Sequence, residues 1–409
     1  MIRTDLLRGT DLRDDPSKFF EAHRILARHA VEHGPGFWIR FTVHYNLFAG
    51  TVLAVGNEDQ VKELDRYQED GALGCFSLTE KLAGVQSGLV VQTTVDYDED
   101  RGVFILNTPS EGARKNWISQ GFTADKTVVL ADLRVGGESK GPHAFVMDFR
   151  NNGDLVPGIT TEDMGKKTTG NDLDNAWIHF DNVELPKSAM LSRYAEIDEA
   201  GEYRVKVDGV RPFDMIGQRL YTGRIAVAQA ALEYRRQLFK VTREYSDAKR
   251  TFAFKGEPVL SMIPQLAAIY EENEREMDEL DAFVGSCEEA LSDCLKAGDV
   301  PPARLVDAIA TCKVRAVETS IAACFRLKQE VGSFALMDDA GFKHMDFLQC
   351  CKFAEGDSRI LMTKMARDRL KLWSKDPEAG DEKERELCGA LSSGISSGFL
   401  TRRQQCQGL

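Results

Sequence analysis

The spacing of hydrophobic and polar residues changes twice along this chain. Up to about residue 70, apolar residues recur about every three to four positions, which is the period of an amphipathic helix. Between about residues 74 and 186, short apolar runs alternate with polar positions and are separated by turn-forming residues, which indicates strands. From about residue 212 to residue 373 the helical period returns. This order predicts helices, then strands, then helices again.

The first region, residues 1–73, is predicted to be a shortened helical segment. Pro16 suits the first turn of a helix, because the N–H that proline lacks would be unpaired there. The triplet Gly34-Pro35-Gly36 stops that helix. The predicted helices cover residues 15–33 and 57–67, with an apolar stretch of small residues over 42–55 between them.

The second region, residues 74–190, is predicted to be a β-domain. Its strands follow one another without intervening helices, which favours an antiparallel barrel or sandwich. The predicted strands cover residues 89–95, 103–106, 127–131, 144–147 and 176–180.

The third region, residues 191–375, is predicted to be a four-helix bundle, because its segments are long and prolines punctuate them. A polar tail over residues 376–409 is expected to lack a core of its own. The predicted helices cover residues 213–247, 259–297, 303–332 and 346–373.

The composition excludes several classes of protein. Of 409 residues, 43% are hydrophobic and 29% are charged, as in ordinary globular proteins. The formal net charge of −13 argues against a non-specific grip on nucleic acid. No run approaches the roughly 18 unbroken apolar residues of a membrane helix, and the N-terminus lacks the apolar core of a secretory signal. We expect a soluble intracellular protein; a peroxisome or another organelle fits, although the sequence has no recognisable targeting signal.

The cysteines indicate neither a disulfide framework nor a metal site. There are nine, an odd number, and they lack the paired spacing of zinc ligands. Cys350 and Cys351 are adjacent, whereas Cys287 and Cys294 lie seven residues apart in a predicted helix. We expect reduced thiols in a reducing compartment.

Five short sequence motifs follow one another along the chain in a recognisable order. They are Cys75–Glu80, Phe104–Pro109 with Lys115–Ser119, Asp174–Pro186, Tyr245–Phe252 and Phe353–Gly356. This ordered set resembles the acyl-CoA oxidase and acyl-CoA dehydrogenase superfamily, and most closely its oxidase branch. The resemblance extends over about residues 40–370. It implies an α+β, acyl-CoA dehydrogenase-like fold with an N-terminal helical segment, a central antiparallel β-barrel or sandwich and a C-terminal four-helix bundle.

The resemblance implies FAD as the cofactor. Main-chain groups near Phe76 and Leu78 and the hydroxyl of Thr79 would bind the pyrimidine edge of the flavin, Trp117 would pack on the ring, and Ser119 would bond near N5. Flavin needs such a polar edge and an apolar wall. Without the ordered motifs, Trp117 and Thr79 would be interpreted as ordinary strand residues.

The resemblance also implies a second set of cofactor contacts near the pyrophosphate and adenosine, with the pair Lys249 and Arg250 acting across a subunit interface. A homodimer or homotetramer is therefore expected. The set consists of Lys249, Arg250, Thr251, Gln329 and Gly332. Each has an ordinary alternative, because cations on helix surfaces are common and a Gln-x-x-Gly sequence is also typical of a helix C-cap.

By the same resemblance, Glu355 is the catalytic base that removes the proton α to an acyl-CoA thioester, and Gly356 leaves room for the acyl group. Arg224 and Gly84 are expected to contact the substrate. Flavin would accept the β-hydrogen as hydride, and O₂ or an electron-transfer protein would reoxidise it.

Several positions depart from the family pattern. The residues after Glu80 lack the usual phosphate-binding serine, and Lys249 replaces an arginine, which exchanges a bidentate contact for a point charge. Asn116, Ala253, Ser333 and Asp357 differ as well. Two alternatives follow: a flavoprotein of this fold that acts on a non-CoA substrate such as a nitroalkane or an amine, or a non-catalytic binding or scaffold subunit.

Overall fold

The computed structural model of the chain describes residues 2–4, 6–84, 90–210, 212–253, 256–378, 380–383 and 385–389, and only the backbone of residues 212–214. The chain divides into two compact units, Met1–Asp357 and Ser358–Leu409. The first unit contains the three regions that the hydrophobic pattern predicts, and the second contains the helix α11, Ser358–Lys375.

The N-terminal region is helical, as predicted, but more finely divided. The helix expected over residues 15–33 is interrupted at His29, and the apolar stretch over 42–55 is a continuous helical run that includes a π-helical part. The elements are α1 (Asp11–Asp14), α2 (Pro16–Arg28), α3 (Ala30–His33), α4 (Gly36–Thr42), the π-helix Val43–Ala49, α5 (Gly50–Val55) and α6 (Glu58–Asp70).

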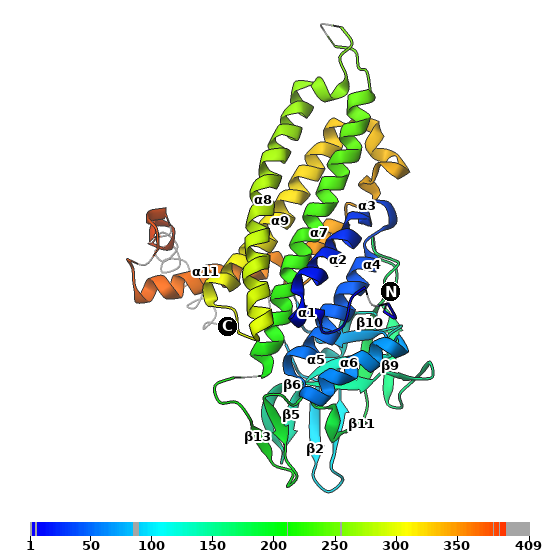
Figure 1. Cartoon of the computed structure of the whole chain (residues 1–409), viewed down its shortest axis with the longest axis vertical. Coiled ribbons are helices and arrows are strands. Elements are labelled where there is room, and N and C mark those ends of the chain that lie inside the picture. The colour runs from blue at the N-terminus through cyan, green and yellow to red at the C-terminus, as the bar shows by residue number, and fades with distance from the viewer. Residues whose placement is uncertain are drawn as a thin grey trace, which may run out of the picture. The chain divides into compact units, whose positions relative to one another are not determined.

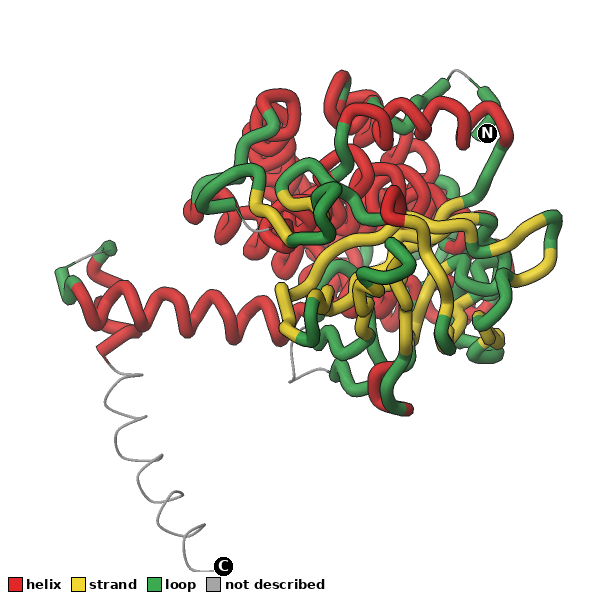
Figure 2. Tube along the Cα trace, turned by 90° about the horizontal axis from the view of Figure 1, so that it is seen from below, coloured by secondary structure: helices red, strands yellow, loops and turns green. Residues whose placement is uncertain are grey.

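The β-domain consists of a six-stranded sheet, a three-stranded sheet and two short hairpins (Figure 2). The large sheet has the order β1 (Gly74–Ser77), β5 (Lys126–Val135), β2 (Thr94–Asp98), β3 (Val103–Asn107) and β11 (Val183–Pro186), and β6 (Glu138–Asp148) pairs with β5. The small sheet has the order β4 (Lys115–Ser119), β10 (Asn175–Phe180) and β9 (Ile159–Asp163). The hairpins are β7 (Arg150–Asn151) with β8 (Asp154–Leu155) and β12 (Ala195–Ile197) with β13 (Tyr203–Val205).

Two details of the predicted β-domain were wrong. The large sheet is mixed, because β1 and β2 both pair with β5 in the parallel direction, across connections long enough for a crossover. The strand expected over residues 89–95 begins at Thr94, and residue 89 lies outside the described part of the chain. The N–H groups of Gln92 and Thr93 instead donate to the buried carboxylate of Glu80.

Three long helices form the bundle of the first unit, α7 (Pro212–Ala248), α8 (Pro264–Ala297) and α9 (Ala303–Glu330) (Figure 1). The fourth predicted helix, over residues 346–373, is wrong as a continuous element. It is divided into α10 (Phe347–Phe353) and α11, because Glu355 and Gly356 have φ values of 56° and 101°. Short 3₁₀ turns lie at Glu111–Ala113, Lys187–Ala189, Leu260–Met262, Gly332–Leu336, Asp338–Ala340 and Phe342–His344.

One hydrophobic core joins the N-terminal helices, the large sheet and the bundle. It includes Phe48 of the π-helix, Val128 of β5 and Ile225 of α7, all of which are buried. The ring of Phe48 lies so close to Gly74 that a Cβ there would come within 2.2 Å of it. The first residue of β1 must therefore be glycine for the strand to lie against the helical region. No helix within the described residues is long and apolar enough to cross a membrane.

Helix α6 should depend on its N-cap. The side chain of Asn57 accepts a hydrogen bond from Gln60 N–H, and the side-chain oxygen of Gln60 accepts one from Asn57 N–H. Asn57→Ala should therefore lower the free energy of unfolding by about 1 kcal/mol, measured by urea denaturation. Asn57→Ser should recover most of the loss, because serine caps helices comparably well. An alanine variant as stable as the wild type would contradict this account.

Candidate active site

Glu355 lies on a turn that two cations hold in place, the fully buried Lys313 and the partly buried Arg224. Its φ of 56° is in the left-handed region, which costs a non-glycine residue conformational energy. Arg224 of α7 donates from Nε to the carbonyl of Glu355 at 3.0 Å. Lys313 of α9 donates from Nζ to the carbonyls of Lys352, at 2.7 Å, and Gly356, at 2.8 Å. The bundle thus fixes both sides of the turn, and the cost of the strained residue is offset by these charge-assisted hydrogen bonds.

The carboxylate of Glu355 is buried against the backbone of α7. A Cβ at Gly223 would come within 2.3–2.6 Å of the carboxylate atoms, so only glycine leaves room for them. Oε2 is buried and has no hydrogen-bond partner among the described residues. Burial raises the pKa of Glu355 to about 7, against the attraction of Arg224 and Lys313. A carboxyl group with this pKa can act as a general base near neutral pH.

Burial also changes the pKa values of the two cations that hold the turn. Burial lowers the pKa of Lys313 to about 8, while Cys351, Asp357 and Glu355 act in the opposite direction. Burial also lowers the pKa of Arg224, which in addition lies over the ring of Tyr221 at 5.3 Å. Both side chains therefore place positive charge beside the turn that carries Glu355.

The sequence predicted Glu355, Gly356 and Arg224, and the structure brings these three together. Gly223 and Lys313 were missed. A lone glycine inside a strong helical pattern is a weak signal of close packing, and Gly223 directly precedes Arg224. Lys313 is one of two cations, with Arg315, in the otherwise largely apolar helix segment Ala310–Val317, and nothing in the local pattern distinguishes it. Which partner either residue meets depends on tertiary contacts.

A second group of predicted residues gathers where β1 meets β4. In the described sheet β1 has a strand partner on one side only, β5, and Asn116 N–H donates to Thr79 C=O just beyond the strand. Trp117 has a φ of 57°, and its side chain is 57% exposed. The hydroxyl of Ser119 accepts a hydrogen bond from Asn175 Nδ2 at 3.1 Å, which leaves its O–H able to donate. Phe76 and Leu78 are buried in or directly after β1.

The third group lies at the far end of the bundle. The rings of Tyr245 and Phe334 stack at 3.8 Å, which joins the end of α7 to the turn after α9. The residues predicted there are Lys249, Arg250, Thr251, Gln329 and Gly332, whose φ is 66°. From Arg224 to Ala248, α7 rises about 36 Å. Within one chain, the third group is therefore far from the turn that carries Glu355.

Gly84 was predicted to contact the substrate. It is exposed, and a Cβ placed on it would meet nothing within 4 Å. The following residues 85–89 lie outside the described part of the chain. Its predicted role remains a prediction.

Comparison with known proteins adds evidence about ancestry. No protein-family model matches the chain. Acyl-coenzyme A oxidase 2 of Yarrowia lipolytica is 34% identical over 239 residues, which cover 56% of this chain and 33% of that protein. The peroxisomal acyl-coenzyme A oxidase 3 of Arabidopsis thaliana is 30% identical over 219 residues, covering 53% and 32% respectively. The match thus spans about a third of each relative's length.

Solved structures resemble the chain over most of its length. Acyl-CoA oxidase-2 from Caenorhabditis elegans, bound with FAD, ascaroside-CoA and ATP, has a TM-score of 0.74 at 20% identity, and the match covers 84% of this chain and 53% of that one. Butyryl-CoA dehydrogenase from Megasphaera elsdenii has a TM-score of 0.68 at 22% identity, with 87% and 83% covered. The chain has the acyl-CoA oxidase and dehydrogenase fold. The resemblance seen in the sequence motifs is thereby confirmed.

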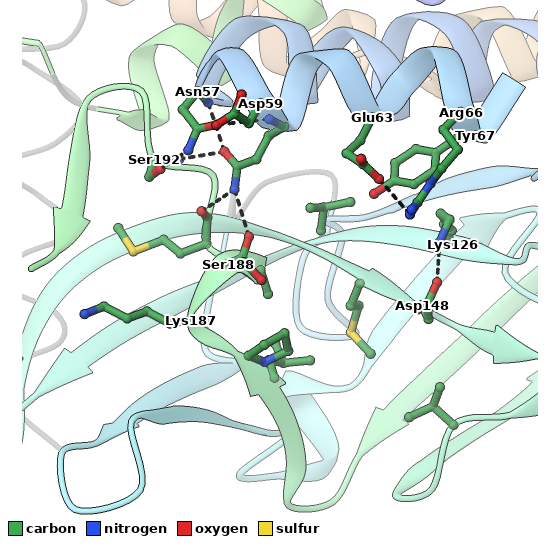
Figure 3. A pocket seen from close by; sticks show the side chains of 18 of the residues that line it. Asn57, Asp59, Glu63, Arg66, Tyr67, Lys126, Asp148, Lys187, Ser188 and Ser192 are labelled. Atoms are coloured by element: carbon green, nitrogen blue, oxygen red, sulfur yellow. Dashed lines mark hydrogen bonds and ion pairs between the residues drawn. The ribbon is translucent and has the colours of Figure 1, made fainter. Parts of the chain in front are cut away.

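A cavity of about 680 Å³ lies elsewhere in this acyl-CoA oxidase fold, between α6 and the large sheet. Figure 3 shows Glu63, Arg66 and Tyr67 of α6 on one side of it, facing Lys126 and Asp148 of the sheet. Arg66 pairs with Glu63 at 2.6 Å, and Lys126 pairs with Asp148. None of the predicted site residues lines this cavity.

The raised pKa of Glu355 should make stability depend on pH. Since the folded pKa is about 7 and the ordinary value is 4.5, the folded state binds more protons than the unfolded state between these values. This carboxyl therefore lowers stability as the pH rises through that window. Glu355→Gln should be more stable than the wild type by up to about 3 kcal/mol at pH 8, and the gain should fall below about 1 kcal/mol at pH 5.

Denaturant unfolding at the two pH values tests this expectation. Glu274→Gln, a change of an exposed glutamate on α8, serves as the control and should show no such pH-dependent gain. Equal gains of Glu355→Gln at both pH values would show that the Glu355 carboxyl is not buried as described.

Proposed function

We propose that this chain is an FAD-dependent oxidoreductase that dehydrogenates an acyl-CoA thioester to the trans-2-enoyl thioester. The observation that carries the proposal is the buried carboxylate of Glu355, whose Oε2 has no hydrogen-bond partner among the described residues and whose pKa burial raises to about 7, on a turn held by Arg224 and Lys313. The match to proteins named acyl-coenzyme A oxidases supports the oxidation of an acyl-CoA thioester as the reaction in which this carboxylate takes part.

In the proposed reaction Glu355 takes the proton from the carbon α to the thioester carbonyl. The β-hydrogen leaves with its electron pair, and a carbon–carbon double bond forms. Bound FAD supplies the acceptor for that hydride. The buried position keeps water away from the carboxylate, which preserves its basicity. The Glu355 N–H and the nearby cations Arg224 and Lys313 would stabilise the negative charge that develops on the thioester oxygen.

The residues in the β-domain fit a flavin. The edge of β1 next to Phe76, Leu78 and Thr79 offers main-chain donors and acceptors in a line, which suits the alternating polar edge of the ring. The exposed indole of Trp117 offers an apolar wall, and a large exposed aromatic side chain is typical of a binding surface. The Ser119 hydroxyl is free to donate to the ring.

The position of the third group supports a homo-oligomer. Lys249, Arg250 and Thr251 lie about 36 Å along α7 from the level of Arg224, beyond the reach of a cofactor bound beside Glu355 of the same chain. A second copy would bring them to the pyrophosphate and adenosine of that cofactor, as we propose. A homodimer is the smallest assembly that completes the site.

The acceptor and the compartment follow from the relatives. Since the matched proteins are named oxidases, we propose that O₂ reoxidises the flavin. The Arabidopsis relative is named peroxisomal, as is the human peroxisomal acyl-coenzyme A oxidase 3, which is 29% identical over 252 residues. We propose the same compartment for this chain.

The visible spectrum of the purified protein tests the proposal. It should show a flavin band that bleaches when palmitoyl-CoA is added without oxygen. Glu355→Gln should retain the band and slow the bleaching by about 10²- to 10⁴-fold, the usual contribution of a general base. A flavin that no CoA thioester reduces would favour the alternative of a non-CoA substrate. A protein that takes up no FAD would favour a scaffold subunit.

The clearance at Gly223 gives a sharper test of the base. Gly223→Ala should displace the carboxylate and slow bleaching by about a hundredfold, because small misplacements of a reacting group are costly. Gly217→Ala is the matched control on the same helix, where a Cβ meets nothing within 4 Å, and it should leave the rate unchanged. Equal rates in both variants would contradict the proposed position of Glu355 in the reaction.

A further inference from the structure

Lys115, at the start of β4, is a lysine with no exposed side-chain surface. Its Nζ donates three hydrogen bonds: to the carbonyl of Leu78 at 3.2 Å, to Glu80 Oε1 at 2.9 Å and to the carbonyl of Leu130 at 2.7 Å. An ammonium group has three donors, so all of them are used. One side chain thereby ties together β4, the end of β1 and β5.

Glu80 is equally buried and equally satisfied. Oε1 accepts from Thr93 N–H, from the Thr93 hydroxyl and from Lys115, and Oε2 accepts from Gln92 N–H at 2.7 Å. The same two segments are also joined by their main chains, because Glu80 and Lys115 form an isolated β-bridge and Asn116 N–H donates to Thr79 C=O. The pair therefore fixes the residues on both sides of Thr79.

A buried ion pair is a poor device for stability alone. Removing two charges from water costs several kcal/mol per ion, and apolar replacements of similar volume are often neutral or stabilising. Burial lowers the pKa of Lys115 to about 8 in spite of the neighbouring Glu80, which shows how large the desolvation is. Unlike an apolar pair, a buried ion pair fixes the direction of the carbonyl and N–H groups to which it is hydrogen-bonded.

The segments that the pair joins are those proposed to hold the flavin. Leu78 and Thr79 follow β1 and face the pyrimidine edge in the proposed function, and β4 carries Trp117 and Ser119 two and four residues after Lys115. With the flavin in the proposed place, the ammonium group would put a positive charge near the cofactor, which accumulates negative charge when it is reduced. Loss of that charge alone would leave Glu80 uncompensated beside the ring.

We propose that Lys115 and Glu80 are positioning residues for the flavin: their buried pair holds the β1 end and β4 in the register that binds the ring, and Lys115 favours the reduced cofactor. This proposal rests on the proposed function. Neither residue was among the site residues that the sequence predicted.

The experiment compares Lys115→Met, Lys115→Arg and the double variant Lys115→Met/Glu80→Gln by FAD titration and by the midpoint potential of the bound flavin, without substrate. Lys115→Met should bind FAD at least tenfold more weakly. In addition, its preference for oxidised over reduced flavin should increase about tenfold relative to the wild type. This change corresponds to a fall of about 30 mV in the two-electron midpoint potential. The double variant should have the midpoint potential of the wild type but should still bind FAD more weakly than the wild type. Lys115→Arg should keep the potential.

Lys126→Met is the control, since Lys126 is also an ion-paired lysine of the β-domain, on β5 next to β1. It should leave both quantities unchanged. The proposal is overturned if Lys115→Met keeps wild-type affinity and potential, or if the variants differ only in folding, as judged by far-UV circular dichroism. If Lys115→Met alone fails to fold, the double variant decides: wild-type affinity in it overturns the proposal. A wild-type protein that binds no FAD would contradict the proposed function instead.

Discussion

The requirement to bury one carboxylate organises much of this structure. Glu355 has to leave water, adopt a left-handed backbone and yet stay close to two cations. No single helix can meet all three conditions. Gly223 and Arg224 come from α7 and Lys313 from α9, so the turn has its observed form only when the bundle has closed around it. The chemistry that we propose is therefore a property of the packed bundle.

Buried lysines bind main-chain carbonyl groups at two places in the first unit. Lys313 and Lys115 are both fully buried, and both donate to main-chain carbonyls at or just beyond the end of a helix or strand, Lys313 to Lys352 and Gly356 and Lys115 to Leu78. Carbonyl groups at the end of a helix or strand have lost their regular partners, and leaving them unpaired in the interior is costly. A lysine can satisfy several of them because its three donors rotate about a single atom. Each lysine thus makes an irregular segment as well defined as the element before it.

The shared core connects these two places. Phe48 of the π-helix packs on Gly74 at the start of β1, while Ile225 of α7 lies in the same hydrophobic cluster, one residue after Arg224. The strand edge that we propose binds the flavin and the helix that holds Glu355 are consequently fixed relative to each other by apolar contacts. The far end of α7 is too distant to take part, which is why we infer that a second copy completes the site.

The sequence by itself determined the class of each region, the approximate extents of α7 and α9 and the candidates Glu355, Gly356 and Arg224, whereas α8 begins at Pro264, five residues after the predicted start. The periodicity of hydrophobic residues indicates which residues, three or four apart, share one face of a helix. The ordered motifs indicate ancestry. Only the tertiary structure decided the parallel pairing of β1 with β5, the break between α10 and α11, and the roles of Gly223, Lys313, Lys115 and Glu80. These features depend on contacts between residues far apart in the chain, such as Lys313 with Gly356. A local pattern of hydrophobic and polar residues carries no information about such partners.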